Sequence, residues 1–205
     1  MQYLEIHPNS PQLRLISQVV AAIRHGAVIA YPTDSSYALG CCLGNKAAMD
    51  RICKIRKIDK DHNFTLVCRD LSEISTYAKL NNVEFRLLKT LTPGPYTFIL
   101  GATKEVPRRL QNPKRKSIGL RVPDHPITWA LLEALGEPLM SVTLSLPDKD
   151  LPLTDADEIR NIIGKQVDMI IDGGHCGFEP TTVIDLQDGS PIVVRQGKGD
   201  TSFLD

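Results

Sequence analysis

Aromatic residues, an excess of either charge and long apolar runs are all scarce in this chain of 205 residues. Only 5% of the residues are aromatic, and 24 Lys and Arg are balanced by 24 Asp and Glu. The longest apolar runs, Val19–Ile23 and Ala27–Tyr31, have five residues each, whereas a membrane-spanning helix needs about 20. The first residues lack the basic start and apolar stretch of a secretion signal. We therefore expect a soluble, cytoplasmic protein without a membrane segment.

Common metal, redox and nucleotide motifs are also missing. The five cysteines are odd in number, form no CxxC pair and include the neighbours Cys41 and Cys42, a pattern that favours neither a disulfide framework nor a zinc site. The five histidines show no metal-ligand spacing, so we expect no protein-bound metal. The chain also lacks the P-loop, the GxGxxG fingerprint, the GxSxG nucleophile elbow and the HExxH zinc signature.

The composition and pattern are those of one globular α/β domain over residues 1–205. Hydrophobic residues make up 42% and charged residues 23% of the chain, near the average for globular proteins. Strand and helix signals alternate along the chain, which predicts a single sheet with flanking helices. Strands are expected at 27–31, 64–68, 96–100, 118–122, 139–143, 168–172, 181–186 and 192–194. Helices are expected after the cap Ser10, at 46–57, 70–79, 83–90 after the cap Asn82, 126–135 and 155–163.

The charges are unevenly distributed although they cancel overall. Between Arg51 and Arg121, 16 basic residues outnumber 6 acidic ones, and the rest of the chain carries the opposite excess. A basic face attracts phosphate groups. The alternative is that these charges are scattered over solvated helix surfaces.

Hydroxyl side chains gather at the ends of three predicted strands, at 31–36, 141–145 and 180–182. Ligands of open α/β sheets collect where strand ends form a crevice, and hydroxyls there can bind a phosphate or an amino acid without adding charge. Serine and threonine are also common turn residues. Three such clusters together favour a polar ligand site.

Three arginines could serve as anion-binding partners of these hydroxyls. Arg121 lies within an apolar strand, where it must either face solvent or pair with an anion. Arg195 has the same character. Arg56 lies near the end of a predicted helix, where a cation also offsets the helix dipole.

Six motifs occur in order along the chain. They are Tyr31-Pro32-Thr33-Asp34, Thr92-Pro93-Gly94-Pro95-Tyr96-Thr97, Leu120-Arg121-Val122-Pro123-Asp124-His125-Pro126, Ser141-Val142-Thr143, Pro180-Thr181-Thr182-Val183-Ile184-Asp185 and Arg195-Gln196-Gly197. Together they resemble the YrdC/YciO family, the threonylcarbamoyl-AMP synthase fold, from about residue 10 to residue 197. The stretches Arg56-Lys57-Ile58-Asp59, His62-Asn63-Phe64-Thr65-Leu66 and Cys68-Arg69-Asp70-Leu71 are most similar to its YciO branch.

The resemblance implies a twisted, open mixed sheet with flanking helices around a basic concave cavity, the YrdC/RibB-like fold. It also implies condensation of ATP, bicarbonate and L-threonine into threonylcarbamoyl-AMP and pyrophosphate, with Mg²⁺ accompanying the ATP. That product feeds the N6-threonylcarbamoyladenosine modification of tRNA. Family members have also been associated with double-stranded RNA.

Carried over by position, the family's binding residues fall into two groups. Thr33, Arg121 and Thr181 would surround the threonine. The nucleotide would lie near Arg56, Lys60, Ser117, Thr143, Ser145 and Arg195. No catalytic nucleophile is implied, and the chemistry would depend chiefly on positioning.

Two motifs depart from the family pattern. The family's Lys-x-Arg-Pro appears here as Arg56-Lys57-Ile58-Asp59, and its Ser-x-Asn appears as Thr143-Leu144-Ser145. An isoleucine cannot replace the charged fork of an arginine, and losing one such contact costs roughly 1.5–3 kcal/mol, or about 10- to 150-fold in binding. Lys57 or Lys60 could compensate by reaching into the site.

Three functions therefore remain open. The first is a threonylcarbamoyl-AMP synthase-like enzyme, in which the altered motifs could favour the reverse reaction or hydrolysis of the adenylate. The second is a paralogue that binds tRNA or double-stranded RNA, with little base stacking because aromatics are few. The third is a small-anion or nucleotide binder without turnover. The best RNA contacts would be Arg108, Arg109, Lys114, Arg115 and Lys116.

Overall fold

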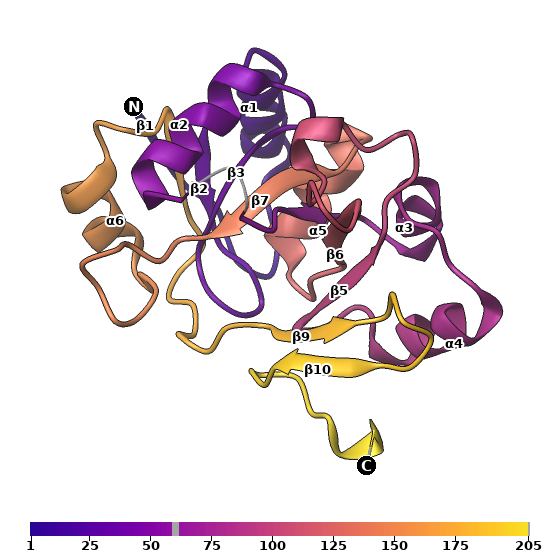
Figure 1. Ribbon diagram of the computed structural model, residues 1–205. Helices are drawn as coiled ribbons and strands as arrows, with labels where there is room; N and C mark the ends of the chain where they lie inside the picture. The colour runs from indigo at the N-terminus through magenta and orange to yellow at the C-terminus, as the bar shows by residue number, and fades with distance from the viewer. Residues whose placement is uncertain (59–61, 205) are drawn as a thin grey trace.

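A single ten-stranded sheet is the framework of the protein in the computed structural model, which describes residues 1–58 and 62–204 (Figure 1). Its strands are β1 (Gln2–Glu5), β2 (Ile29–Tyr31), β3 (Ala38–Cys42), β4 (Thr65–Val67), β5 (Tyr96–Gly101), β6 (Ser117–Arg121), β7 (Leu139–Thr143), β8 (Met169–Asp172), β9 (Thr182–Asp185) and β10 (Ile192–Arg195). Their order across the sheet is β1-β8-β2-β3-β7-β4-β6-β5-β9-β10.

The sheet is mixed and open, as predicted. β8 runs parallel to both β1 and β2, and the pairs β4–β6 and β5–β9 are also parallel. The other neighbours are antiparallel. The first and last strands of the chain, β1 and β10, are the two edges and lie at opposite ends of the sheet (Figure 1).

Helices cover both faces of the sheet. They are α1 (Leu13–Arg24), α2 (Lys46–Arg56), α3 (Leu71–Tyr77), α4 (Asn82–Leu91), α5 (Pro126–Leu135) and α6 (Ala156–Ile163), with short 3₁₀ turns at Arg108–Leu110 and Ser202–Leu204. Apolar residues of α1 and α5 pack with Tyr31, Val67 and Leu139 on one face. The other four helices contribute to a second core cluster on the opposite face. No helix within the described residues is long and apolar enough to cross a membrane.

Because side chains alternate along the central strands, a polar surface lies beside the apolar core that α1 and α5 form on the sheet. In β6, Ile118 and Leu120 enter the second core cluster, so Gly119 and Arg121 point to the other face. In β7, Met140 and Val142 belong to that same cluster, which leaves Ser141 and Thr143 on the opposite face. The face that α1 and α5 partly cover therefore continues as a floor of small and polar residues.

Two strands and two caps differ from the sequence prediction. β1 and β3 were not predicted, because β1 is paired to β8 far along the chain and Ala38–Cys42 contains Ala and Gly, which are poor strand formers. Ser10 does not cap α1: the N-cap is Gln12, without a side-chain capping bond. The predicted cap Asn82 is also wrong, because the carboxamide of Asn81 accepts the bonds that begin α4.

The capping box of α4 gives a stability prediction with a matched control. Asn81 Oδ1 accepts hydrogen bonds from the backbone N of Val83 and of Glu84, each 2.9 Å long, and Glu84 Oε2 accepts the backbone N–H of Asn81 at 2.8 Å. Asn81→Ala removes the side-chain acceptor, so we expect the free energy of unfolding to fall by about 1 kcal/mol. Asn82→Ala, one residue later, should change it little. Urea unfolding of both variants checks this, and equal effects would contradict the assignment.

Candidate functional site

A cavity of about 820 Å³ opens on the polar part of the sheet face. Strands β3, β4, β5, β6, β7, β9 and β10 contribute to its wall, together with the turn after β2 and the last residue of α2. Seven of the residues that the sequence singled out line this one cavity, although they lie far apart in the chain. They are Thr33, Arg56, Arg121, Thr143, Ser145, Thr181 and Arg195.

Two other predicted nucleotide-binding residues stand apart from these seven. Ser117 lies on β6 two residues before Gly119 and so points to the same face, where it is buried at 3% exposure without lining the cavity. Lys60 lies outside the described residues. The structure therefore brings most of the predicted set together in the wall of one cavity.

The turn after β2 is held by the hydroxyl of Thr33. Thr33 Oγ1 accepts hydrogen bonds from the backbone N of Ser35 at 3.2 Å and of Ser36 at 3.3 Å. It also donates to the carbonyl oxygen of Ser36 at 2.6 Å. Threonine and serine favour such turns because the side chain bonds its own backbone. The turn thus places Thr33 and Ser36 rigidly in the cavity wall.

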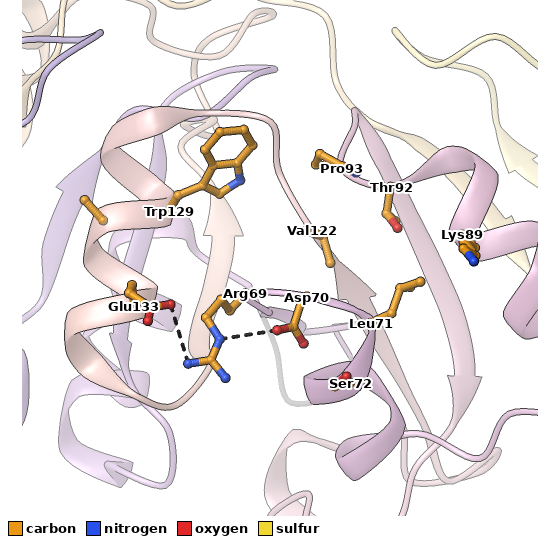
Figure 2. Close-up of a pocket in the computed structure, with 11 residues that line it drawn as sticks. Arg69, Asp70, Leu71, Ser72, Lys89, Thr92, Pro93, Val122, Trp129 and Glu133 are labelled. Carbon is orange, nitrogen blue, oxygen red and sulfur yellow. Dashed lines mark ion pairs between the residues drawn. The ribbon is translucent and has the colours of Figure 1, made fainter.

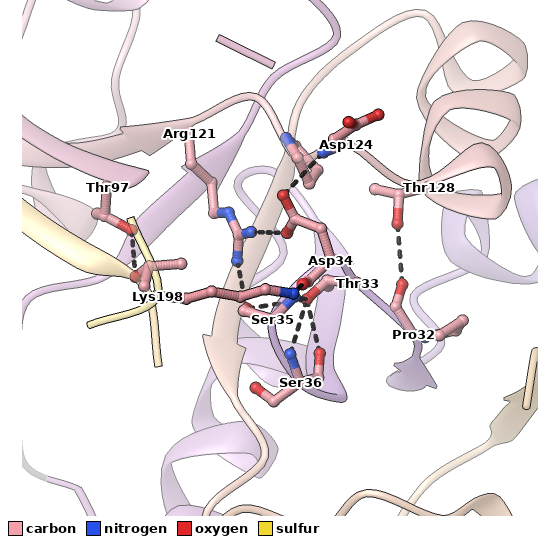
Figure 3. A network of polar contacts seen from close by, with 12 residues as sticks. Pro32, Thr33, Asp34, Ser35, Ser36, Thr97, Arg121, Asp124, Thr128 and Lys198 are labelled. Atoms are coloured by element: carbon pink, nitrogen blue, oxygen red, sulfur yellow. Dashed lines mark hydrogen bonds and ion pairs between the residues drawn. The ribbon is translucent and has the colours of Figure 1, made fainter. Parts of the chain in front are cut away.

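Arg121 is buried, and its anion is Asp34 of the same turn (Figure 3). One Nη of Arg121 forms an ion pair with Asp34 Oδ1, and the other donates to Ser35 Oγ at 3.3 Å. The second carboxylate oxygen of Asp34 accepts the backbone N–H of Asp124 at 2.9 Å. Sequence reasoning assigned Asp34 no role. The signal was present, however, because an arginine in an apolar strand requires an anion.

Arg195 and two threonines form the part of the cavity wall that lies near β9. The guanidinium of Arg195 donates to the carbonyl oxygen of Thr181 from Nε at 3.1 Å and from Nη2 at 2.9 Å. Thr181 Oγ1 lies 2.8 Å from Thr97 Oγ1. Burial lowers the pKa of Arg195. Among the residues that the structure describes, its guanidinium contacts a neutral carbonyl and a hydroxyl and no carboxylate, so its charge remains available to an anion.

Arg56 is the least satisfied cation in the wall. Its Nε is buried and has no hydrogen-bond partner among the described residues, and burial lowers the pKa of its guanidinium. Lys57 adopts a left-handed backbone conformation (φ 50°), and its Nζ lies 3.7 Å from Asp148 Oδ2. Ile58 packs against the core. Of the altered Arg56-Lys57-Ile58 motif, only Arg56 therefore lines the cavity.

Three large apolar side chains at the cavity wall are unusually exposed. Leu151 is 56%, Phe178 54% and Val194 58% exposed to solvent, and all three line the cavity. They come from separate segments of the chain. An apolar surface of this kind suits a flat or apolar part of a ligand, whereas the arginines suit its anionic part.

A second cavity, of about 710 Å³, lies between α3, α4 and α5 and is lined by Lys89, Trp129 and Arg69 among others (Figure 2). Two carboxylates offset the charge of its arginine, because Arg69 Nε lies 3.4 Å from Asp70 Oδ2 and Arg69 Nη1 lies 3.6 Å from Glu133 Oε2. No residue predicted as a ligand contact lines it. The first cavity is therefore the better candidate for an anionic ligand.

The predicted RNA contacts lie outside both cavities. Arg108, Arg109, Lys114 and Lys116 are exposed. Arg115 is engaged within the protein, because its guanidinium pairs with Asp185 at 2.5 Å and with Asp188 at 3.3 Å. Four of the five cations thus remain at the surface for a polyanion.

The chain is similar in sequence and fold to several known proteins. The Escherichia coli protein YciO is 60% identical over 199 residues, 97% of each chain, and its crystal structure superposes with a TM-score of 0.95 at 59% identity over 98% of each chain. The threonylcarbamoyl-AMP synthase of Vibrio vulnificus is 29% identical over 161 residues, which is 77% of this chain and 86% of that protein.

A further structural relative carries a ligand. The crystal structure of P. abyssi Sua5 complexed with L-threonine superposes with a TM-score of 0.87 at 26% identity, over 96% of this chain and 58% of that one. Residues 21–197 match the family model for Sua5, YciO and YrdC, described as telomere recombination. The chain therefore belongs to the Sua5/YciO/YrdC family.

Proposed function

We propose that the cavity binds ATP and L-threonine and that the protein forms threonylcarbamoyl-AMP from them with bicarbonate. The observation that carries the proposal is Arg56, a partly buried guanidinium in the wall of a large cavity without an anionic partner among the described residues. Burying an unpaired charge is costly, and a bound phosphate would satisfy it. The synthase relatives and the threonine complex of Sua5 support the same choice of substrates.

The cavity has the size that two such substrates need, and its wall has separate cationic, polar and apolar parts. Its volume, about 820 Å³, lies within the range of roughly 300–1,000 Å³ for small-molecule sites. Arg56 and Arg195 offer cations to the phosphates, and the turn at Thr33 offers hydroxyl and backbone groups to the amino acid. Exposed Phe178 and Leu151 offer apolar surface to the adenine base.

The proposed reaction needs positioning more than it needs a reactive side chain. The amine of threonine combines with bicarbonate to give a carbamate and water. A carbamate oxygen then attacks the α-phosphorus of ATP, the bond from that phosphorus to the bridging oxygen breaks, and pyrophosphate leaves. The chain's contribution is to hold the reactants together and to place Arg56 and Arg195 where they stabilise the departing negative charge.

Mg²⁺ would arrive with the nucleotide. Asp150 is the one acidic side chain that lines the cavity within the described residues, whereas Mg²⁺ in nucleotide sites is held largely by phosphate oxygens and water, with one or two carboxylates. We therefore place the ion on the phosphates, where it would neutralise part of their charge. Arg56 and Arg195 would neutralise another part.

The altered motifs set the expected strength of this activity. Because Ile58 packs into the core and supplies no charge, the cavity keeps one cation where the family motif has two. We expect the same adenylate-forming reaction with weaker binding of the triphosphate. The reverse reaction and hydrolysis of the adenylate would use the same contacts, so both belong to this proposal.

Pyrophosphate release tests the proposed reaction. Purified protein with ATP, Mg²⁺ and bicarbonate should release pyrophosphate only when L-threonine is present, because the carbamate is the nucleophile. Release without threonine would indicate plain ATP hydrolysis. If folded protein binds ATP and releases none, synthesis is excluded, and turnover of preformed threonylcarbamoyl-AMP then distinguishes a hydrolase from a binder without turnover.

Arg56→Gln tests the phosphate contact. The change keeps a polar side chain and removes the charge, so we expect ATP affinity to fall about 10- to 150-fold with little loss of stability. Lys54→Gln, an exposed position on the same helix, is the matched control and should bind ATP normally. Calorimetric titration measures both. Equal affinities would place the phosphates elsewhere.

RNA binding is the second candidate function, favoured by the exposed cations at Arg108, Arg109, Lys114 and Lys116. If they contact phosphates, the double variant Arg108→Ala/Arg109→Ala should bind a short RNA duplex more weakly. The slope of log affinity against log salt should also become shallower by about 1 per lost contact. The control Arg14→Ala/Lys165→Ala removes two exposed charges elsewhere. An unchanged slope, or no binding by the wild type at low salt, would eliminate this function.

A further inference from the structure

The segment that follows β10 is anchored beside the cavity by its backbone. Lys198 donates its backbone N–H to the carbonyl oxygen of Pro180 at 2.9 Å. The hydroxyl of Thr182 accepts the N–H of Gly197 at 3.0 Å and donates to the carbonyl oxygen of Gly199 at 2.7 Å. A Cβ at Gly197 would lie 2.3 Å from the carbonyl oxygen of Pro180. This close packing requires a glycine and fixes where the Lys198 side chain begins.

From that anchor, the side chain of Lys198 reaches across to the turn after β2 (Figure 3). Its Nζ donates to the backbone carbonyl oxygen of Asp34 at 2.5 Å. Asp34 also carries the carboxylate that pairs with Arg121. The ammonium group thus lies at the turn whose residues Thr33 and Ser36 line the cavity, whereas Lys198 itself is exposed and is not among the lining residues.

The charges of the described residues around this turn leave Lys198 without an ion-pair partner, although Asp124 lies next to Asp34. The guanidinium of Arg121 is neutralised by the carboxylate of Asp34, with both side chains only 9% exposed. Thr33, Ser35 and Ser36 are neutral. Within residues 1–58 and 62–204, no carboxylate lies within ion-pair distance of Lys198, whose hydrogen-bond acceptor is a neutral carbonyl.

We infer that Lys198 binds the α-carboxylate of the amino acid substrate. This inference rests on the proposed function and adds a residue to its amino-acid subsite. Arg121 is poorly suited to the same task, because taking a second carboxylate would place two anions on one buried cation. The flexible lysine stem lets Nζ leave the Asp34 carbonyl for a charged acceptor, and a hydrogen bond between charged groups is roughly twice as strong as a neutral one.

The test compares two ligands that differ only at the carboxylate. L-Threoninol replaces it with a hydroxymethyl group and keeps the amine and the side-chain hydroxyl. Wild-type protein should bind L-threonine about 10- to 150-fold more tightly than L-threoninol. Lys198→Gln should lose this preference by weakening L-threonine alone. Lys198→Arg, which restores a cation, should recover part of it.

Controls separate the inference from the proposed function. Lys116→Gln removes an exposed lysine outside the cavity and should keep the wild-type preference, and thermal melting checks that each variant is folded. If the wild type binds L-threonine and Lys198→Gln still discriminates against L-threoninol, the inference is overturned while the proposed function stands. If the wild type, saturated with ATP and Mg²⁺, binds neither ligand, both are overturned. If Lys198→Gln binds L-threonine and L-threoninol more weakly by the same factor, Lys198 has a merely structural role and the inference is also overturned.

Discussion

The charge of Arg121 at the end of a central strand is the constraint around which the site is built. A guanidinium buried in a sheet must have an anion, and Asp34 supplies it from the turn after β2. The carboxylate in turn receives the backbone of Asp124, and the carbonyl of the same residue receives Lys198. One buried charge therefore brings together three distant chain segments, which are the end of β2, the end of β6 and the segment after β10.

The same strands build the core and the floor of the cavity. Because side chains alternate, Leu120 can pack into the core while Gly119 faces the cavity. A Cβ at Gly119 would lie 2.9 Å from Thr65 Oγ1 and 3.1 Å from the carbonyl oxygen of Phe64, so the close approach of the neighbouring chain requires glycine at this position of the floor. The cavity is thus a consequence of which residues occupy one face of the sheet, and it needs no separate domain to form it.

Local patterns in the sequence were enough to predict the class of the fold, and the family resemblance identified seven of the residues that line the cavity. Strand signals around Arg121 and Thr181 and the helix ending at Arg56 were correctly located, since each depends on neighbouring residues. Arg121 indicated that an anion was needed, but neither the choice of Asp34 as that anion nor the contact of Lys198 was predictable, because both depend on partners that only the folded chain brings near. β3 was missed for a related reason: Ala38–Cys42 has weak strand propensity and is stabilised by its neighbours β2 and β7.

The short segment from Arg195 to Lys198 couples the positions of two cations. Both residues are tied to the start of β9, Arg195 through the carbonyl of Thr181 and Lys198 through that of Pro180. A displacement of this segment would move the guanidinium and the ammonium together. A ligand that binds one of these two cations and shifts the segment would therefore also move the other, and by thermodynamic linkage the effect of each contact on the other would be reciprocal.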